Sequence, residues 1–427
     1  MEEIVLYYIA VGLISYFGLF TTVFFIMTFI EYKKKLQDPY VNPTDKNLPK
    51  VSILVPAYNE EKAIVRTIKS LQELNYPKDK VEIMVIDDGS NDRTYELSKK
   101  LAKEDSRIIV YTKQNGGKGS ALNYGIAKAK GEFIISMDAD SFASKDALIH
   151  MIGYFQDKKV MAVTPSMTLY KPKGFLQNLQ FAEYTLGIFL RKTFGMLNCI
   201  HVTPGPFSIY RKAFFNKYGG YDENNLTEDI DIALRIQKNG YKIENSIHAG
   251  IYTIAPNKFK PLLKQRMRWY YGFTSNVLKN KDLFHPKFGY MAVLMLPSAF
   301  LSVFFSVMLA LYFIYKNIDY FIARLTELSV TGLNLFSLEL KNFNLQNNIN
   351  LITSELTNPL LAIVIVAMCF TIGILLYTRK KTKNERGMFL PILYFLLTYW
   401  FFYSLWWVSP FVYKLFGGKI GWGKRKH

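Results

Sequence analysis

The stretch that decides the fold runs from Val51-Ser-Ile-Leu-Val55 to Val81-Glu-Ile-Met-Val-Ile86. Both ends are short β-branched apolar runs, which predict buried strands, and a helix-like segment lies between them from about Glu60 to Leu74. A third apolar run, Phe133-Ile-Ile135, follows another helical stretch near residues 120–130. Strands that alternate with helices predict an α/β fold with a parallel sheet, which binds ligands at the carboxyl ends of its strands.

Polar residues follow each of these three runs. They are Pro56-Ala57-Tyr58-Asn59-Glu60, Asp87-Asp88-Gly89-Ser90 and Asp138-Ala139-Asp140. An isolated Asp-Asp-Gly-Ser is most often a turn that caps a helix, because Asp and Ser accept backbone N–H bonds and Gly allows positive φ. Two carboxylates beside a strand end also suit Mg²⁺, which commonly takes one or two carboxylates together with substrate phosphates. A metal-bridged diphosphate is therefore a second interpretation of this edge.

A glycine-rich turn, Gly116-Gly117-Lys118-Gly119-Ser120, opens the helical stretch near residue 120. It is not a Walker A motif, because position 112 is Thr where that motif needs Gly, and it lacks the third Gly of a dinucleotide fingerprint. Backbone N–H groups and a Lys at a helix N-terminus still favour phosphate. The alternative is a solvent-exposed turn, and both interpretations stay open at this point.

Composition and charge point to a membrane protein. The chain has 427 residues, 50% of them apolar and 16% aromatic, with a net charge of +19. A bilayer crossing takes about 20 apolar helical residues. Four uncharged runs are long enough: residues 4–30, 288–315, 356–378 and 388–413. Much of the positive charge flanks these runs, so we expect no nucleic-acid partner.

These runs divide the chain into four parts. They are an N-terminal transmembrane anchor (1–31), a cytoplasmic domain (32–287), three transmembrane segments (288–413) and a basic C-terminal tail (414–427). The positive-inside rule places Lys33-Lys34-Lys35 and the basic cluster at 379–386 in the cytoplasm. The protein is thus predicted to be a multi-pass protein of the cell membrane. The fourth run does not fit this rule, because one more crossing would leave the basic tail outside the cell. The run is therefore either re-entrant or an exception to the rule.

The sequence has three further features: an apolar periodic segment, five histidines and two cysteines. Residues 175–197 have apolar positions at helical spacing, which predicts either an amphipathic helix on the bilayer or a buried packing helix. The five histidines form no spaced ligand set, so none is assigned to a metal, and only His201 and His248 lie near motifs. Cys199 and Cys369 belong to no CxxC or Cys/His cluster, so neither a disulfide scaffold nor a zinc site is indicated, and we interpret Cys199 as structural.

Four further motifs follow in order along the chain. They are Thr203-Pro-Gly205-Pro-Phe-Ser-Ile-Tyr-Arg211, Gly219-Gly220-Tyr221-Asp222, Thr227-Glu228-Asp229-Ile230-Asp231 and Gln265-Arg266-Met267-Arg268-Trp269. Together with the Asp-Asp and Asp-x-Asp loops, this set resembles the membrane-integrated, processive family 2 glycosyltransferases that make cellulose, chitin, hyaluronan and poly-N-acetylglucosamine. The resemblance covers about residues 49–272. It implies a GT-A-type (Rossmann-like) glycosyltransferase domain of the α/β class beside an α-helical transmembrane region.

The resemblance also implies where a UDP-sugar donor would bind. The nucleotide-binding positions would be Ala57, Tyr58, Glu60, Asp88, Lys118 and Asp138. Asp88 would contact the uracil or the ribose, and Ala57 and Tyr58 would form the wall beside the base. Asp138 and Asp140 would hold Mg²⁺ or Mn²⁺, with Asp140 as the direct ligand.

The acceptor side would be formed by the last two motifs. Asp229, with Glu228 beside it, would be the general base, and Gln265, Arg268 and Trp269 would bind the diphosphate and the acceptor sugar. A positioned base is worth roughly 10²–10⁴-fold in rate, and the forked guanidinium of arginine suits phosphate. A single displacement without an enzyme nucleophile inverts the anomeric centre. Trp269 and its aromatic neighbours also fit an interfacial belt near the next span.

The predicted function is that of a processive inverting β-glycosyltransferase that polymerises a UDP-sugar and moves the polysaccharide across the membrane. Thr227-Glu228-Asp229 and the short chain, with no regulatory domain expected after the last span, favour the poly-N-acetylglucosamine type and UDP-N-acetylglucosamine as donor. Expected partners are the growing polysaccharide, membrane lipid, and a second copy or a small membrane subunit that completes a channel. The alternatives are a nonprocessive transferase with a ceramide or polyprenyl lipid acceptor, and an inactive receptor for nucleotide sugars.

Overall fold

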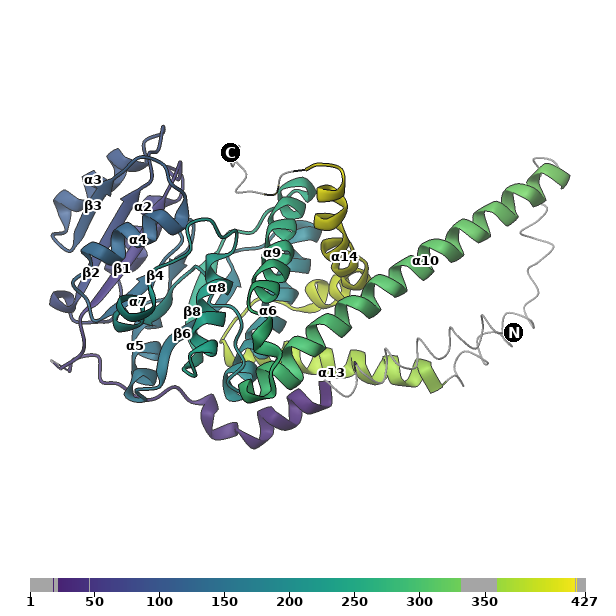
Figure 1. Ribbon diagram of the computed structural model, residues 1–427, viewed down its shortest axis with the longest axis horizontal. Coiled ribbons are helices and arrows are strands. Elements are labelled where there is room, and N and C mark those ends of the chain that lie inside the picture. Colours follow the sequence, from purple (N-terminus) through teal and green to yellow (C-terminus); the bar gives the residue numbers. More distant parts are fainter. Residues whose placement is uncertain (1–17, 19–21, 46, 332–358, 419, 421–427) are drawn as a thin grey trace.

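The computed structural model describes residues 18, 22–45, 47–331, 359–418 and 420. An α/β domain lies at one end of an elongated molecule, and long helices extend from the other end (Figure 1). The three apolar runs form β1 (Val51–Ala57), β2 (Val81–Asp87) and β4 (Phe133–Ser136). The helices expected before the second and third runs are α2 (Ile64–Gln72) and α4 (Lys118–Lys128). These five elements confirm the predicted alternation of strands and helices.

The sheet has eight strands in the order β3-β2-β1-β4-β7-β6-β8-β5. The remaining strands are β3 (Ile108–Thr112), β5 (Phe142–Ala143), β6 (Val160–Leu169), β7 (Ser208–Arg211) and β8 (Lys242–Thr253). β1 pairs in parallel with β2 and β4, but β7 is antiparallel to both β4 and β6. β5 is likewise antiparallel to β8, whereas β6 and β8 pair in parallel, so the prediction of a wholly parallel sheet is wrong and the sheet is mixed. After β6 the chain leaves the sheet and forms a long helix. It then re-enters between β4 and β6, from the end at which β6 finished, so β7 runs in the opposite direction.

Two hydrophobic cores cover the two faces of the sheet. On one face α2, α3 (Thr94–Glu104) and α5 (Ala147–Ile152) pack on strand residues such as Ile53. On the other face α4, α7 (Lys212–Tyr218) and α8 (Glu228–Lys238) pack on residues such as Leu54. Neighbouring strand residues point to opposite faces, and each fully buried aliphatic side chain contributes roughly 1.5–3 kcal/mol. The central strands are thus held rigidly, and their carboxyl ends are fixed in space.

The helix after β6 is α6 (Gly174–Met196), which covers the predicted amphipathic segment. Phe181 and Ala182 of α6 are buried in a cluster with Leu375 and Phe395, which come from the two C-terminal helices. Of the two interpretations of residues 175–197, the structure supports the buried packing helix. α6 joins the sheet domain to the helical part of the molecule.

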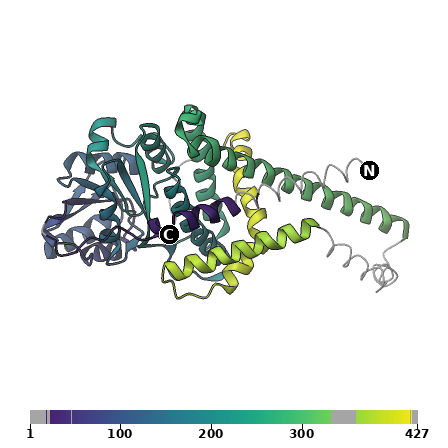
Figure 2. The ribbon, with the colours of Figure 1, turned by 90° about the horizontal axis from the view of Figure 1, so that it is seen from below.

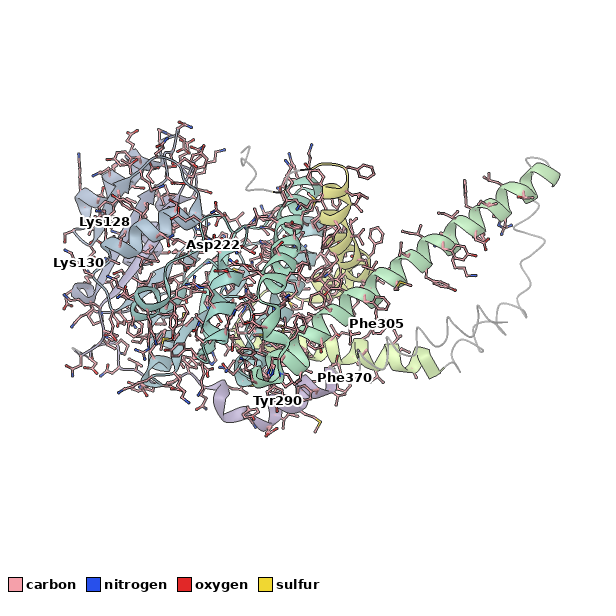
Figure 3. The ribbon with its side chains drawn as sticks, in the orientation of Figure 1. Lys128, Lys130, Asp222, Tyr290, Phe305 and Phe370 are labelled. Carbon is pink, nitrogen blue, oxygen red and sulfur yellow. The ribbon has the colours of Figure 1, made fainter. Side chains whose placement is uncertain are left out.

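Two helices are long and apolar enough to cross a membrane among the residues that the structure describes. Their apolar segments are Met291–Met308, which comprises a short π-helical turn (Met291–Met295) and the start of α10 (Leu296–Thr331), and Phe389–Leu415, which is α14. Both fall on runs that the sequence predicts as spans. α13 (Pro359–Lys381) covers the described part of the run 356–378, and Thr22–Glu31 forms a shorter apolar helix. Two of the four runs thus correspond to helices that could cross a membrane, and the predicted multi-helix transmembrane region is not confirmed among the described residues. Figure 2 shows α10 and α13 leaving the same end of the molecule, and Figure 3 labels Phe305 and Phe370 on them.

α10 extends beyond the predicted run 288–315 and reaches Thr331. Residues 317–331 contain neither Gly nor Pro, and their few charges do not interrupt a helix. Of the two interpretations of the run 388–413, the structure does not support the re-entrant one, because α14 is one continuous helix. Most of the predicted anchor and of the basic tail, and residues 332–358, lie outside the described residues.

Candidate active site

The glycine-rich turn is held against the strand ends by Asp88. This side chain is buried and accepts hydrogen bonds from Lys113 Nζ (2.9 Å), Gly116 N (3.0 Å) and Gly117 N (2.7 Å). Gly117 has φ +86°, a backbone conformation that side-chain-bearing residues rarely adopt. The turn therefore sits directly before the N-terminus of α4, where a phosphate group is favoured.

The loops after β1 and β2 interlock at the same edge. Asp88 N donates to Ala57 O (2.8 Å), Asn59 N donates to Ser90 Oγ (3.0 Å), and Glu60 N donates to Thr94 Oγ1 (2.7 Å). Ala57 is buried, whereas the Tyr58 ring is 36% exposed at the edge. The predicted nucleotide-binding residues of the two loops are thus brought together.

Lys118 connects the glycine-rich turn to two of the acidic motifs. Its Nζ lies 2.7 Å from Asp138 Oδ1 and 2.9 Å from Glu228 Oε1. Burial works against the ammonium charge, but Asp138, Glu228 and Asp229 outweigh it and raise the pKa of Lys118 above its ordinary value. The structure thus gathers four predicted site residues from α4, the loop after β4 and the start of α8.

Asp229 lies in the first turn of α8, where the backbone is fixed from a neighbouring loop. Thr203 N and Thr203 Oγ1 donate to Asp229 O at 3.2 and 2.9 Å. Burial raises the pKa of the Asp229 carboxyl to about 7, and the charge of Glu228 adds to the rise, while Lys118 and Arg268 oppose it. A carboxyl that titrates near neutral pH in such a cluster is suited to general-base chemistry.

The carboxylates after β4 fit a divalent cation that also binds phosphate. The Asp138 side chain is 30% exposed, and Asp140 Oδ1 accepts from Ser141 Oγ at 3.2 Å. In the part of the chain that the structure describes, no group of three or more His, Cys, Asp or Glu could hold a metal ion. Mg²⁺ commonly takes one or two carboxylates and completes its shell with water and phosphate oxygens, so this donor set suits a cation brought with a diphosphate.

α9 (Phe259–Lys279) carries the last motif along one side of the site. Arg268 Nη1 donates to Leu226 O (3.1 Å), in the loop just before α8. Gln265 Oε1 is buried and has no hydrogen-bond partner among the described residues. The Trp269 ring lies 4.5 Å from the Arg266 guanidinium. Of the predicted acceptor residues, Arg268 is thus tied to the segment that leads to Asp229.

Arg266 and Glu183 form a buried ion pair that sequence reasoning missed. Arg266 Nη1 and Nη2 donate to the two Glu183 oxygens at 3.0 and 2.6 Å, and Tyr399 Oη donates to Glu183 Oε1 at 3.1 Å. The pair joins α9 to α6 and to α14. Arg266 lies inside a recognised motif, but nothing in the sequence marks Glu183 as its partner. Tyr270 packs on Trp407 of α14 with ring centroids 4.5 Å apart, so this aromatic neighbour belongs to the same helix interface.

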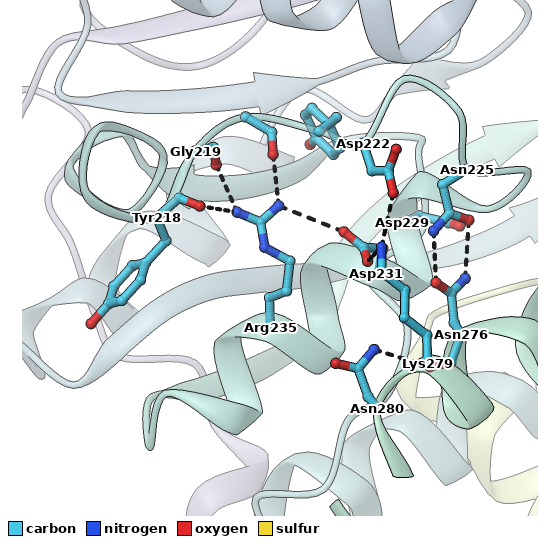
Figure 4. A network of polar contacts seen from close by, with 12 residues as sticks. Tyr218, Gly219, Asp222, Asn225, Asp229, Asp231, Arg235, Asn276, Lys279 and Asn280 are labelled. Carbon is cyan, nitrogen blue, oxygen red and sulfur yellow. Dashed lines mark hydrogen bonds and ion pairs between the residues drawn. The ribbon is translucent and has the colours of Figure 1, made fainter. Parts of the chain in front are cut away.

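An ion-pair network fixes the Gly-Gly-Tyr-Asp motif to α8 and α9 (Figure 4). Arg235 donates to Gly220 O (2.6 Å) and Gly219 O (2.9 Å), and it pairs with Asp231. Lys279 of α9 pairs with Asp222 (2.9 Å) and Asp231 (3.5 Å). Lys279 holds the pKa of Asp222 below its usual range.

The remaining candidates have buried surroundings. His201 lies between the rings of Phe194 and Phe273, and burial, aided by Arg191, lowers its pKa to about 4. His248 is partly buried and lies beside His150, with ring centroids 5.7 Å apart. Cys199 is buried in an apolar cluster, where burial raises its pKa to about 12, in keeping with a structural role.

Comparisons with known proteins agree with this architecture. Residues 52–219 match the model of the family described as glycosyl transferase family 2. Poly-beta-1,6-N-acetyl-D-glucosamine synthase of Staphylococcus aureus is 31% identical over 52% of this chain and 54% of its own length. A probable glycosyltransferase of Bacillus subtilis, YdaM, is 34% identical over 55% of this chain and 57% of its own. The chain thus spans about half the length of the curated relatives it matches.

A solved structure shares the fold. The mannosyltransferase of Pyrobaculum calidifontis, solved in complex with GDP-Man and Mn²⁺, superimposes with a TM-score of 0.51 at 19% identity. The similarity covers 88% of this chain and all of the other. At this identity the similarity concerns the fold, and it agrees with a GT-A-like mixed sheet.

Proposed function

We propose that this chain, which contains a family 2 glycosyltransferase domain at residues 52–219, is an inverting glycosyltransferase that uses Asp229 as its general base. The observation that carries the proposal is the cluster of Asp229, Glu228, Lys118 and Asp138 at the sheet edge, with the pKa of Asp229 raised to about 7. Such a carboxyl is largely ionised just above neutral pH and still basic enough to accept a proton.

The reaction follows from this arrangement. Asp229 removes the proton of an acceptor hydroxyl, whose oxygen attacks the anomeric carbon from the side opposite the nucleotide. The bond from C1 to the diphosphate oxygen breaks, and the nucleoside diphosphate leaves with the electron pair. One displacement inverts the centre, so an α-linked donor gives a β-linkage.

The donor side would neutralise the leaving diphosphate. Lys118 at the N-terminus of α4 is placed for phosphate, and Asp88 keeps the glycine-rich turn in position by accepting from Gly116 N and Gly117 N. Asp138 and Asp140 would hold Mg²⁺ or Mn²⁺, which when bound offsets the negative charge of the diphosphate. Ala57, Tyr58 and Glu60 would surround the base of a UDP-sugar.

The product we propose is a polysaccharide. The support is the 31% identity to the poly-beta-1,6-N-acetyl-D-glucosamine synthases, over about half of each chain, and the apolar helices α10 and α14 beside the acceptor side. We propose UDP-N-acetylglucosamine as the donor, chain growth at the cytoplasmic face of the cell membrane, and export past the helices. A second copy or a small membrane subunit would complete the path, in contact with lipid.

The test is transfer of labelled sugar by the purified, detergent-solubilised protein from a panel of UDP- and GDP-sugars, with the product sized on a gel. We expect a long polymer from UDP-N-acetylglucosamine and none from the Asp229→Asn variant. One labelled sugar on extracted lipid would replace the polymer proposal with the lipid-acceptor alternative. Absence of nucleotide release with every donor would contradict the proposed transfer itself.

A further inference from the structure

The loop before Asp229 is seated on α9 by a pair of amides. Asn225 Nδ2 donates to Asn276 Oδ1 (2.7 Å), and Asn276 Nδ2 donates back to Asn225 Oδ1 (3.1 Å). Asn276 Nδ2 also lies 2.9 Å from Thr227 Oγ1 and 3.3 Å from Thr227 O. Asn276 is 1% exposed, so these contacts replace water completely. Figure 4 shows the two amides facing each other, with Asp229 close by.

A glycine one turn earlier in α9 lets this loop approach closely. A methyl group at Gly272 would overlap with the Thr227 side chain. Arg268, one further turn back, donates to Leu226 O. Residues 268, 272 and 276 are spaced by four and so lie on one face of the helix. This face contacts the segment 225–227 at three successive points.

Thr227, which directly precedes Glu228 and Asp229, has little conformational freedom. Thr227 is buried, and Ile230 N and Asp231 N both donate to Thr227 O, which starts α8. Because Glu228 and Asp229 follow immediately, a displacement of Thr227 moves both carboxylates relative to Lys118 and to the acceptor. The rate of transfer depends strongly on such displacements, since a shift of about 1 Å can lower the rate about 10²-fold.

We propose that Asn276 is a positioning residue for sugar transfer: it fixes Thr227 and thereby places Asp229 against the acceptor hydroxyl. The inference rests on the proposed function of Asp229. Asn276 touches no reacting atom, and it acts only through the loop that it holds. None of its own contacts reaches the glycine-rich turn, and Lys118 keeps its ion pair with Asp138, so the donor side should respond less to its removal than the acceptor side.

The test compares kcat and the donor KM in four variants of the protein. Asn276→Ala should lower kcat by about 10- to 100-fold and leave the donor KM within about twofold. Gly272→Ala should do the same although alanine favours the helix, because its methyl group displaces Thr227. This second variant keeps the test valid if Asn276→Ala folds poorly.

Asn280→Ala is the matched control. Asn280 is a buried asparagine one turn beyond Asn276, and its Nδ2 donates to the backbone oxygen of Asn276 (3.0 Å), so it supports α9 without touching the loop. We expect a lower melting temperature and wild-type kcat. The double variant Asn225→Ala/Asn276→Ala should be no slower than Asn276→Ala alone, because the two amides act as one unit.

Two outcomes overturn the inference. An Asn276→Ala variant with wild-type kcat would show that the amide pair does not position the base. An equal loss of kcat in Asn280→Ala would show that general weakening of α9 is responsible. A wild-type protein that releases nucleotide from no donor would overturn the proposed function as well, so the two failures are distinguishable.

Discussion

The donor side and the acceptor side of the candidate site each contain a carboxylate that is at least partly buried, and the surroundings of the two differ. On the donor side, Asp88 is buried but accepts three hydrogen bonds, two of them from backbone N–H groups. On the acceptor side, burial and Glu228 raise the pKa of Asp229 to about 7, and Gln265 Oε1 has no partner among the described residues. One carboxylate is used to build the fold, whereas the other is held in an unfavourable environment that increases its basicity.

The largest effect expected from this contrast is on catalysis. Asp229→Asn removes the proton acceptor with little change of shape, so kcat should fall by about 10²–10⁴-fold. The donor KM should stay close to the wild-type value, because Lys118 keeps its ion pairs with Asp138 and Glu228 and the glycine-rich turn keeps its hydrogen bonds to Asp88. Nucleotide release under donor saturation measures the first, and a donor titration measures the second. A variant with wild-type kcat would remove Asp229 from the role of base.

The pH dependence of the rate is the next largest effect. Only the ionised carboxyl accepts a proton, and the pKa of Asp229 is raised to about 7, so kcat should fall about tenfold per pH unit below 7. The rate at pH 5 should be about 100-fold below that at pH 8. A rate that is flat between pH 5 and pH 8 would contradict the assignment.

The raised pKa of Asp229 should also make the stability of the fold depend on pH, in the direction opposite to the rate. The folded pKa of Asp229 is raised above its ordinary value of 3.8, so the folded state binds this proton more tightly than the unfolded state. Its contribution to stability is present in full below about pH 4 and is lost as the pH rises through 7. Asp229→Asn should therefore melt at a higher temperature than the wild type at pH 8, although it is inactive.

Asp88→Ala should give the reverse combination on the donor side. Loss of the carboxylate leaves Lys113 without its charged partner and two backbone N–H groups without an acceptor, at a cost of about 1–3 kcal/mol. We expect a lower melting temperature, a higher donor KM and a smaller change in kcat. Thermal melting and donor titration check these effects. A stabilised Asp88→Ala variant would erase the distinction between the two sides.

The donor side is also the part that the sequence predicts best. The runs at Val51 and Val81 are continuous and β-branched, so the two strands and the loops after them can be placed without tertiary information. The position of Lys118 at the start of α4 follows from the glycines around it.

The acceptor side depends on contacts between distant segments, which a sequence pattern does not carry. Glu183 lies 83 positions before Arg266, and Asn225 lies 51 positions before Asn276. Nothing local marks either pair. The reversal of β7 is hidden for the same reason, because it depends on where α6 returns the chain to the sheet. The motifs could thus be identified in the sequence, but the contacts that connect them could not.

The smallest expected effect comes from an ion pair that serves neither side. Lys242 of β8 lies 2.9 Å from Asp157, and the two side chains are 41% and 44% exposed. Water screens such a pair, so Lys242→Ala should change the free energy of unfolding by at most about 1 kcal/mol. The kcat and the donor KM should remain at wild-type values, which gives the baseline for the other variants. If Lys242→Ala lowered kcat as much as Asn276→Ala does, the loss of rate would reflect general destabilisation, and the contrast between the two sides would have no mechanistic content.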